Sequence, residues 1–188
     1  MLAGENRREA NHFNLNHAYS MSSESLTEAL VEQLQDLLDA ETQLVKALPK
    51  MADAAKNDKL RAGFTDHLAE TKGHVDRLEQ AFRLLDRPAK KKTCAAMKGL
   101  VKEGSEVISE QDPSFTRDSL LIGAAQRVEH YEMAAYGTAR ALAEVLERDD
   151  VADLLQETLE EEGAADKKLN IVAMDVNPAA LEEADEAA

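Results

Sequence analysis

The sequence predicts an all-α protein, a bundle of four long helices with one extended connection. Its apolar residues are mostly Ala, Leu and Val, aromatic residues make up only 4%, and Trp is absent, which favours helices over a sheet. Four long segments repeat their apolar residues at the three-and-four spacing of one helix face. A chain of 188 residues suits one domain with a sizeable core.

The apolar spacing indicates where each helix lies. Pro49 should bend the first helix rather than end it, because the spacing resumes at Met51. Asp112 and Pro113 break the chain, and Ser114 or Thr116 can cap the next helix. The long helices are expected over about residues 25–56, 58–85, 115–147 and 150–173, with a short helix over about 94–109. This order describes two helical hairpins joined by a crossover that carries the short helix.

Both ends of the chain lack the pattern of the bundle. Residues 1–22 show no period, so we expect a flexible N-terminal arm, or upstream sequence before a start at Met21. Residues 23–175 form the predicted bundle. Residues 176–188 form an acidic tail that is expected to fray beyond Pro178.

Charge and cysteine content exclude several classes of partner and compartment. The net charge of −15 repels phosphate backbones and anionic lipids, so we expect neither a nucleic-acid nor a membrane partner. Cys94 is the only cysteine, which excludes an intramolecular disulfide and predicts a small buried residue. There is no apolar run of 18 residues and no hydrophobic signal core, so a cytoplasmic location is expected.

Acidic residues interrupt the apolar stripes of two helices. Glu41 falls near the middle of a stripe that includes Leu34, Leu37 and Leu44. Glu132 lies within roughly 40° of the centre of the third long helix's stripe, with Glu129 on its flank. An unpaired buried carboxylate is costly, so each needs a counter-charge, a proton or a metal ion.

The other two helices repeat this arrangement. Glu70 sits about 120° to one side of its helix's stripe, and Glu161 sits on the same flank by the same angle. The segment HLAETKGHVDRL (67–78) aligns with TLEEEGAADKKL (158–169), and Glu70 follows Glu41 by 29 residues, as Glu161 follows Glu132. Two such hairpins would bring four glutamates together at the middle of the bundle. Two divalent cations would balance their charge, whereas pairing with Arg or Lys is the simpler alternative.

The sequence resembles a known family. The blocks AETQLVKALPKMA, FTDHLAET, CAAMKGLVKEGSEVI, AAQRVEHYEMAAYGT and ETLEEEGAAD, spread over residues 25–173, are similar to the YciE/YciF-like family of bacterial stress-induced proteins in the ferritin-like superfamily. The resemblance implies a ferritin-like four-helix bundle, a homodimer and a dinuclear metal site. Carried over, the family's carboxylates are Glu41, Glu70, Glu129, Glu132 and Glu161.

One feature departs from the ferritin-like pattern, in which two helices each carry Glu-x-x-His. Gly73 and Ala164 stand three residues after Glu70 and Glu161. His67 and His74 lie on the same helical face as Glu70 and are candidate substitutes. The resulting oxygen-rich site suits two iron or manganese ions better than zinc or copper.

Two functions from different classes follow. The first is a dimetal redox protein of peroxidase, catalase-like or ferroxidase type, whose small oxidant is peroxide or dioxygen. The second is a non-enzymatic dimeric scaffold with a vestigial or structural metal site. The matched spacings favour the first function, and the missing Glu-x-x-His motifs favour the second.

Overall fold

The computed structural model describes the backbone of residues 5–186 and the side chains of residues 23–186. The helices are α1 (Glu5–Ala54), α2 (Asp58–Leu84), α3 (Ala95–Glu110), α4 (Phe115–Val145) and α5 (Asp149–Glu186), and no strand occurs among the described residues. The all-α prediction is therefore confirmed. None of the described helices is both long and apolar enough to span a membrane.

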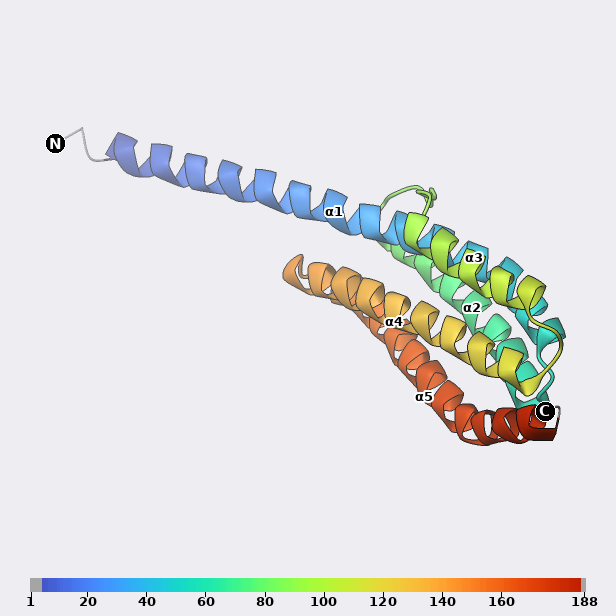
Figure 1. The fold of residues 1–188 in the computed structure, drawn as a ribbon. Helices are drawn as coiled ribbons and strands as arrows, with labels where there is room; N and C mark the ends of the chain where they lie inside the picture. Colours follow the sequence, from blue (N-terminus) through green and yellow to red (C-terminus); the bar gives the residue numbers. More distant parts are fainter. Residues whose placement is uncertain (1–4, 187–188) are drawn as a thin grey trace.

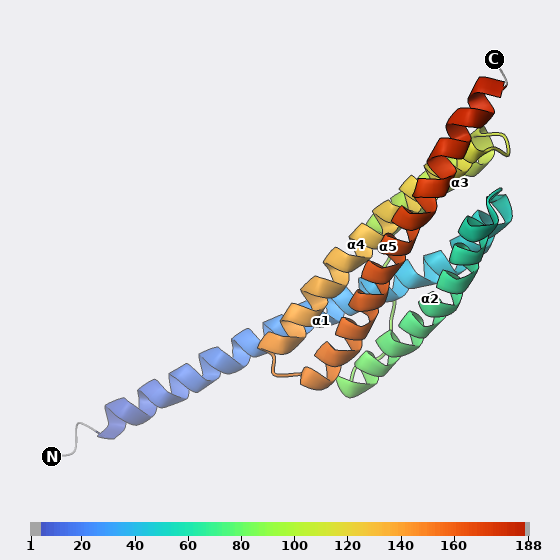
Figure 2. The ribbon, with the colours of Figure 1, turned by 90° about the horizontal axis from the view of Figure 1, so that it is seen from below.

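The long helices form two antiparallel hairpins, α1 with α2 and α4 with α5 (Figures 1 and 2). Helix α3 lies in the crossover between them and packs against α1 and α4. The N-terminal part of α1 continues beyond the rest of the bundle (Figure 1). This is the expected crossover topology, and it brings all four long helices around one central layer.

Side chains mark the helix starts. Asn57 caps α2 by accepting from the backbone N–H groups of Lys59 and Leu60. Ser114 caps α4 by accepting from the N–H of Arg117, as expected from the sequence. Cys94 is buried, as predicted, and its Sγ accepts from the N–H of Met97 at the start of α3. These caps satisfy N–H groups that a helix start leaves without an intrahelical partner.

Helices α1 and α5 are longer than we expected. Helix α1 begins at Glu5, whereas we expected the first helix from about residue 25. Helix α5 runs through Pro178 to Glu186, and Val176 is fully buried. The side chain of Glu183 accepts from the N–H of Phe115 and pairs with Lys56. These contacts hold the segment from Val176 to Glu183 against the bundle, so this part of the expected tail is helical and in contact with the core.

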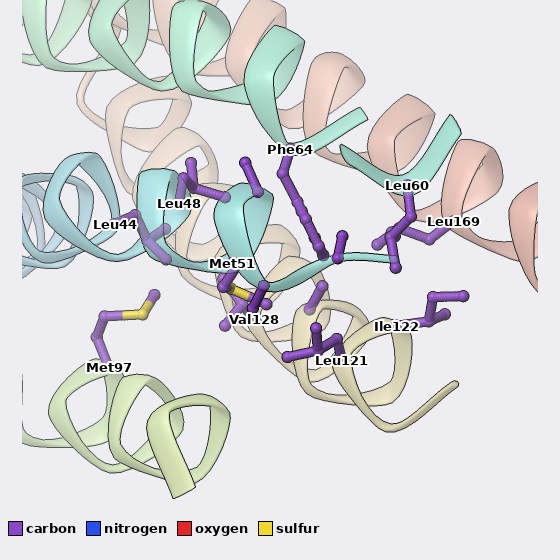
Figure 3. Packing of buried hydrophobic residues seen from close by; sticks show 14 of the residues in the cluster. Leu44, Leu48, Met51, Leu60, Phe64, Met97, Leu121, Ile122, Val128 and Leu169 are labelled. Carbon is purple, nitrogen blue, oxygen red and sulfur yellow. The ribbon is translucent and has the colours of Figure 1, made fainter. Parts of the chain in front are cut away.

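The core consists of two apolar clusters at different heights in the bundle. One contains residues such as Leu44, Phe64 and Leu121 (Figure 3), and the other contains residues such as Leu34 and Phe82. On every long helix, buried polar side chains separate most residues of one cluster from those of the other. Together they form a polar layer that consists of Glu41, His67, Thr71, His74, Glu129, Glu132, Thr158 and Glu162.

Candidate metal centre

Helix α1 contributes Glu41 to the polar layer. The side chain is completely buried, and its Oε1 accepts a hydrogen bond from the hydroxyl of Tyr136 on α4. Its Oε2 has no hydrogen-bond partner. Burial raises the pKa of Glu41, although His74 and Tyr136 partly oppose the shift.

Helix α2 contributes two histidines, each held from behind by a carboxylate. His67 Nδ1 lies 3.2 Å from Glu70 Oε2, and His74 Nε2 lies 2.9 Å from Glu161 Oε2. The opposite nitrogens, His67 Nε2 and His74 Nδ1, are buried without a well-aligned hydrogen bond. A carboxylate that fixes one ring nitrogen and leaves the other facing a cluster of acids is typical of a metal-ligating histidine.

Helix α4 contributes Glu129 and Glu132, one turn apart and both buried. Neither oxygen of Glu132 has a hydrogen-bond partner, and Glu129 Oε2 also lacks one. Burial raises the pKa of Glu132 well above its usual range, and the nearby acids raise it further. Burial likewise raises the pKa of Glu129, to about 8. In the absence of a cation, both groups therefore tend to hold a proton.

Helix α5 contributes Glu162, a fully buried acid that lies between the two histidines. Its Oε1 is 3.1 Å from His74 Nδ1, and its Oε2 is 3.8 Å from His67 Nε2. Neither oxygen makes a hydrogen bond. Glu162 thus presents one oxygen to each side of the cluster, as a bridging carboxylate would.

The ligand atoms fall into two groups that could each hold a metal ion. The first group is His67, Glu129, Glu132 and Glu162, and the second is Glu41, His74 and Glu162. Within each group, the candidate ligand atoms lie within 4.8 Å of one another. Because Glu162 belongs to both groups, the arrangement is that of two adjacent cation positions with a shared carboxylate.

The acids also change the ionisation of the histidines. Burial by itself lowers the pKa of His74, but the neighbouring Glu162 and Glu41 outweigh it and raise the pKa to about 10. Burial also lowers the pKa of His67, and Glu70, Glu129 and Glu162 together raise it to about 9. In the metal-free protein, protonated histidines therefore supply part of the positive charge that the buried acids need.

Two of the sequence-predicted ligands do not converge on the cluster. Glu70 is partly exposed, and besides His67 it contacts Lys168 Nζ at 3.1 Å. Glu161 is also partly exposed, and Arg77 binds both of its oxygens. The expected four-glutamate layer is therefore corrected: Glu70 and Glu161 support the histidines from outside, and the buried acid of α5 is Glu162.

Sequence reasoning missed Glu162, although the sequence contains a signal for it. Glu162 follows the buried Leu155 by seven residues, which places it within about 20° of the centre of that helix's apolar stripe. The internal repeat also places position 162 in the core. Glu132 lies 91 residues after Glu41, and by the same shift Glu162 corresponds to Thr71, which is buried as well. His74 thus stands three residues after Thr71, where the ferritin-like motif has its histidine, and the equivalent position on α5 is Ala165.

The fold and the cluster together define a ferritin-like helical bundle with a buried carboxylate and histidine centre. The chain belongs to the family described as Domain of unknown function (DUF892), whose model matches residues 25–182. It is 43% identical to Protein YciF of Escherichia coli (strain K12) over 155 residues, which is 82% of this chain and 93% of that protein. The resemblance to the YciE/YciF-like family is thereby confirmed.

Solved structures support the same assignment. The crystal structure of the E. coli stress protein YciF superposes with a TM-score of 0.79 and covers 81% of this chain and 97% of its own. YcfI from Rhodopseudomonas palustris, described as a candidate structural protein, is 42% identical with a TM-score of 0.75, and the match covers 77% of this chain and 92% of that one. A Xanthomonas campestris protein, 19% identical with a TM-score of 0.66 over 86% of this chain and 99% of its own, shares the fold.

Proposed function

We propose that the chain binds two metal ions, iron or manganese, in the buried cluster, and that the loaded site reacts with a small oxidant such as peroxide or dioxygen. The observation that carries this proposal is the arrangement of Glu162, which presents one oxygen toward each histidine and hydrogen-bonds with neither. A bridging carboxylate between two ligand groups is what a dinuclear centre requires.

The donor set supports a metal better than it supports an ordinary buried ion network. Buried polar atoms are normally hydrogen-bonded, yet the cluster leaves eight without a partner: Glu41 Oε2, His67 Nε2, His74 Nδ1, Glu129 Oε2 and both oxygens of Glu132 and of Glu162. No arginine or lysine contacts Glu41, Glu129, Glu132 or Glu162 among the described residues. Two divalent cations would balance these four carboxylates, and carboxylates with two imidazoles suit iron or manganese.

The chain's own residues would prepare the site for such chemistry. Iron or manganese can change valence and so supply electrons to a bound oxidant. Glu70 and Glu161 orient His67 and His74, and the Tyr136 hydroxyl holds a proton against Glu41. The two apolar clusters on either side exclude water, which strengthens the electrostatic interactions between the ligands and a cation.

Metal counting tests the proposal. Protein reconstituted anaerobically with Fe²⁺ or Mn²⁺ should hold about two ions per chain, and an added oxidant should be consumed with a change in absorbance. Glu162→Gln keeps the shape of the side chain but removes its charge, so metal content should fall below one ion per chain. Glu160→Gln, at an exposed neighbouring position, is the matched control and should retain both ions. Unchanged metal content in Glu162→Gln would contradict the ligand assignment.

A second candidate function is a non-enzymatic dimeric scaffold. It is favoured by Thr71 and Ala165, which stand where the internal repeat and the ferritin-like motif would place a glutamate and a histidine. Protein that takes up no metal and keeps its thermal stability in chelator would support the scaffold. The net charge of −15 supports a protein without nucleic-acid or membrane partners, the single cysteine supports a cytoplasmic location, and the family resemblance supports a homodimer.

A further inference from the structure

A second structural feature touches the cluster, a pocket of about 100 Å³ between α2 and α5. Its inner end is formed by the buried His67 and Glu129, and its outer end by exposed residues that include Lys59 and Lys168. The pocket therefore leads from the surface to the first of the two ligand groups.

The pocket exists because small residues stand where larger ones would fill it. Ala165 lies one turn after Glu162, at the position where the ferritin-like motif has a histidine, and offers only a methyl group. Gly63 lines the pocket from α2, and a Cβ added there would meet no atom within 4 Å. Ala165 in place of a histidine and Gly63 without a side chain thus leave open space beside the cluster.

The walls are apolar. Leu60 and Phe64 from α2 and Leu169 from α5 line the pocket, and Figure 3 shows these three side chains within the same core cluster. The lysines at the outer end already have partners, because Lys59 pairs with Asp175 and Lys168 pairs with Glu70. Neither lysine that lines the pocket is therefore free for an anion. Asp66 and Glu70 also line the outer end, but a cation would have to leave them and bury an unpaired charge to reach the apolar middle of the pocket, so the middle favours a neutral molecule with an aliphatic body.

The inner end offers a place for one polar head. His67 Nε2 and Glu129 Oε2 are buried without hydrogen-bond partners, and both residues line the pocket. A metal ion would take up His67 Nε2 and one oxygen of Glu129, which leaves the second Glu129 oxygen to accept a hydrogen bond from a hydroxyl group. In the metal-free protein, the hydroxyl can also pair with His67 Nε2. The volume corresponds to about three water molecules, enough for a short aliphatic chain of a few heavy atoms.

We propose that the α2–α5 pocket binds a small neutral alcohol or alkyl hydroperoxide, with its hydroxyl or hydroperoxyl head toward His67 and Glu129 and its aliphatic body between Leu60, Phe64 and Leu169. This inference rests on the proposed function for the presence of metal beside the head group. It adds the class of molecule that reaches the site and the route by which it enters.

The test uses three probes that share a tert-butyl body: neutral tert-butanol, anionic pivalate and cationic tert-butylamine. In Mn²⁺-loaded protein, the paramagnetic ion should enhance the relaxation of the methyl protons of bound tert-butanol in a saturable manner. The two charged probes should give little enhancement. Equal enhancement by pivalate, or none by tert-butanol, would overturn the proposal.

Variants locate the effect. Gly63→Leu fills the pocket and should weaken tert-butanol binding by about tenfold. Gly73→Leu is the matched control, because Gly73 is on the same helix, has equally open space at its Cβ and lies outside the pocket. Undiminished binding in Gly63→Leu would overturn the proposal. If that variant fails to fold, the comparison of the three probes on the wild-type protein decides.

Metal content, measured on the same samples, separates the two proposals. Two bound Mn²⁺ ions without a tert-butanol effect would reject the pocket and keep the metal site. Protein that binds neither Mn²⁺ nor Fe²⁺ would reject the proposed function. In that case, saturation-transfer NMR of tert-butanol on metal-free wild-type and Gly63→Leu protein tests the pocket by itself, and equal or absent transfer would overturn it.

Discussion

The ring of His74 on α2 meets the carboxylate of Glu161 on α5, with Nε2 2.9 Å from Oε2. Arg77 donates to both oxygens of the same carboxylate, and Nδ1 of His74 faces the buried cluster. The hydrogen bond from Arg77 is the largest cause of the lowered pKa of Glu161. Glu161 thus remains ionised and fixes the orientation of a candidate ligand without lying in the cluster itself.

The first prediction concerns this pair. Glu161→Gln should weaken metal binding by about 10- to 100-fold, because partners of a ligating histidine typically contribute that much, while the number of bound ions stays at two. Competition with a metal chelator measures the affinity. Glu157→Gln removes the other acidic partner of Arg77, which is more exposed than Glu161, and should have little effect. A complete loss of metal in Glu161→Gln would instead indicate that Glu161 is a ligand.

The second prediction concerns Glu132, whose two buried oxygens have no partner. Glu132→Leu should stabilise the metal-free protein by about 1–3 kcal/mol, because it removes a buried unsatisfied group. Each kcal/mol should raise the melting temperature by about 2–4 °C in a chain of this size. Thermal unfolding in chelator measures the gain, and the same variant should lose metal. A lower melting temperature would mean that Glu132 has a favourable partner in the metal-free fold.

The third prediction concerns pH. The pKa values of His67 and His74, about 9 and about 10, and that of Glu129, about 8, are all raised in the folded state. The folded protein therefore binds more protons than the unfolded chain, so the metal-free protein should lose stability as pH rises from about 6.5 to 10. Metal binding requires deprotonated ligands, so metal affinity should rise over the same interval. Melting curves in chelator and metal titrations at each pH check both slopes, and a metal-free stability that increases toward pH 10 would contradict the assignment.

At acidic pH, Glu70 makes the stability of the protein change with pH in the opposite direction. Its pKa is lowered to about 2 by its hydrogen bond to His67 and by Lys168, against the effect of partial burial. The stability that Glu70 contributes is present above about pH 4.5 and is lost as pH falls toward 2. Glu70→Gln should therefore flatten the acid side of the stability profile and leave the alkaline loss unchanged.

The fourth prediction concerns the proton on Tyr136, whose hydroxyl donates to Glu41. Tyr136→Phe should retain two metal ions, cost about 1–2 kcal/mol of metal-free stability and slow the consumption of oxidant. Tyr131→Phe is the matched control, because Tyr131 lies on the same helix but donates to Asp36, outside the cluster. Equal rates in the two variants would assign Tyr136 a packing role only.

Much of the fold could be predicted because helix patterns are local. The bounds expected for α2 and α4 agree with the structure to within about two residues, and Pro49 lies inside α1 as expected. The predicted end of α5, near residue 173, was wrong, because Pro178 and the acidic residues after it indicate a break in the helix. The burial of Val176 and the contacts of Glu183 with Lys56 and Phe115 outweigh that local signal.

The amino-acid sequence by itself determined that Glu41 and Glu132 lie on apolar stripes and that the two hairpins repeat at a shift of 91 residues. The seven-residue spacing from Leu155 favours Glu162 within the run 160–162, but only the tertiary structure decided that Glu162 enters the cluster while Glu161 stays outside it. Neighbouring residues on a helix point about 100° apart, so the three acids of this run point in three different directions. The packing of α5 against α2 and α4 fixes the rotation of α5 about its axis and so selects the acid that faces the cluster. The same packing pairs Glu161 with Arg77 and His74 and leaves Glu162 facing both histidines.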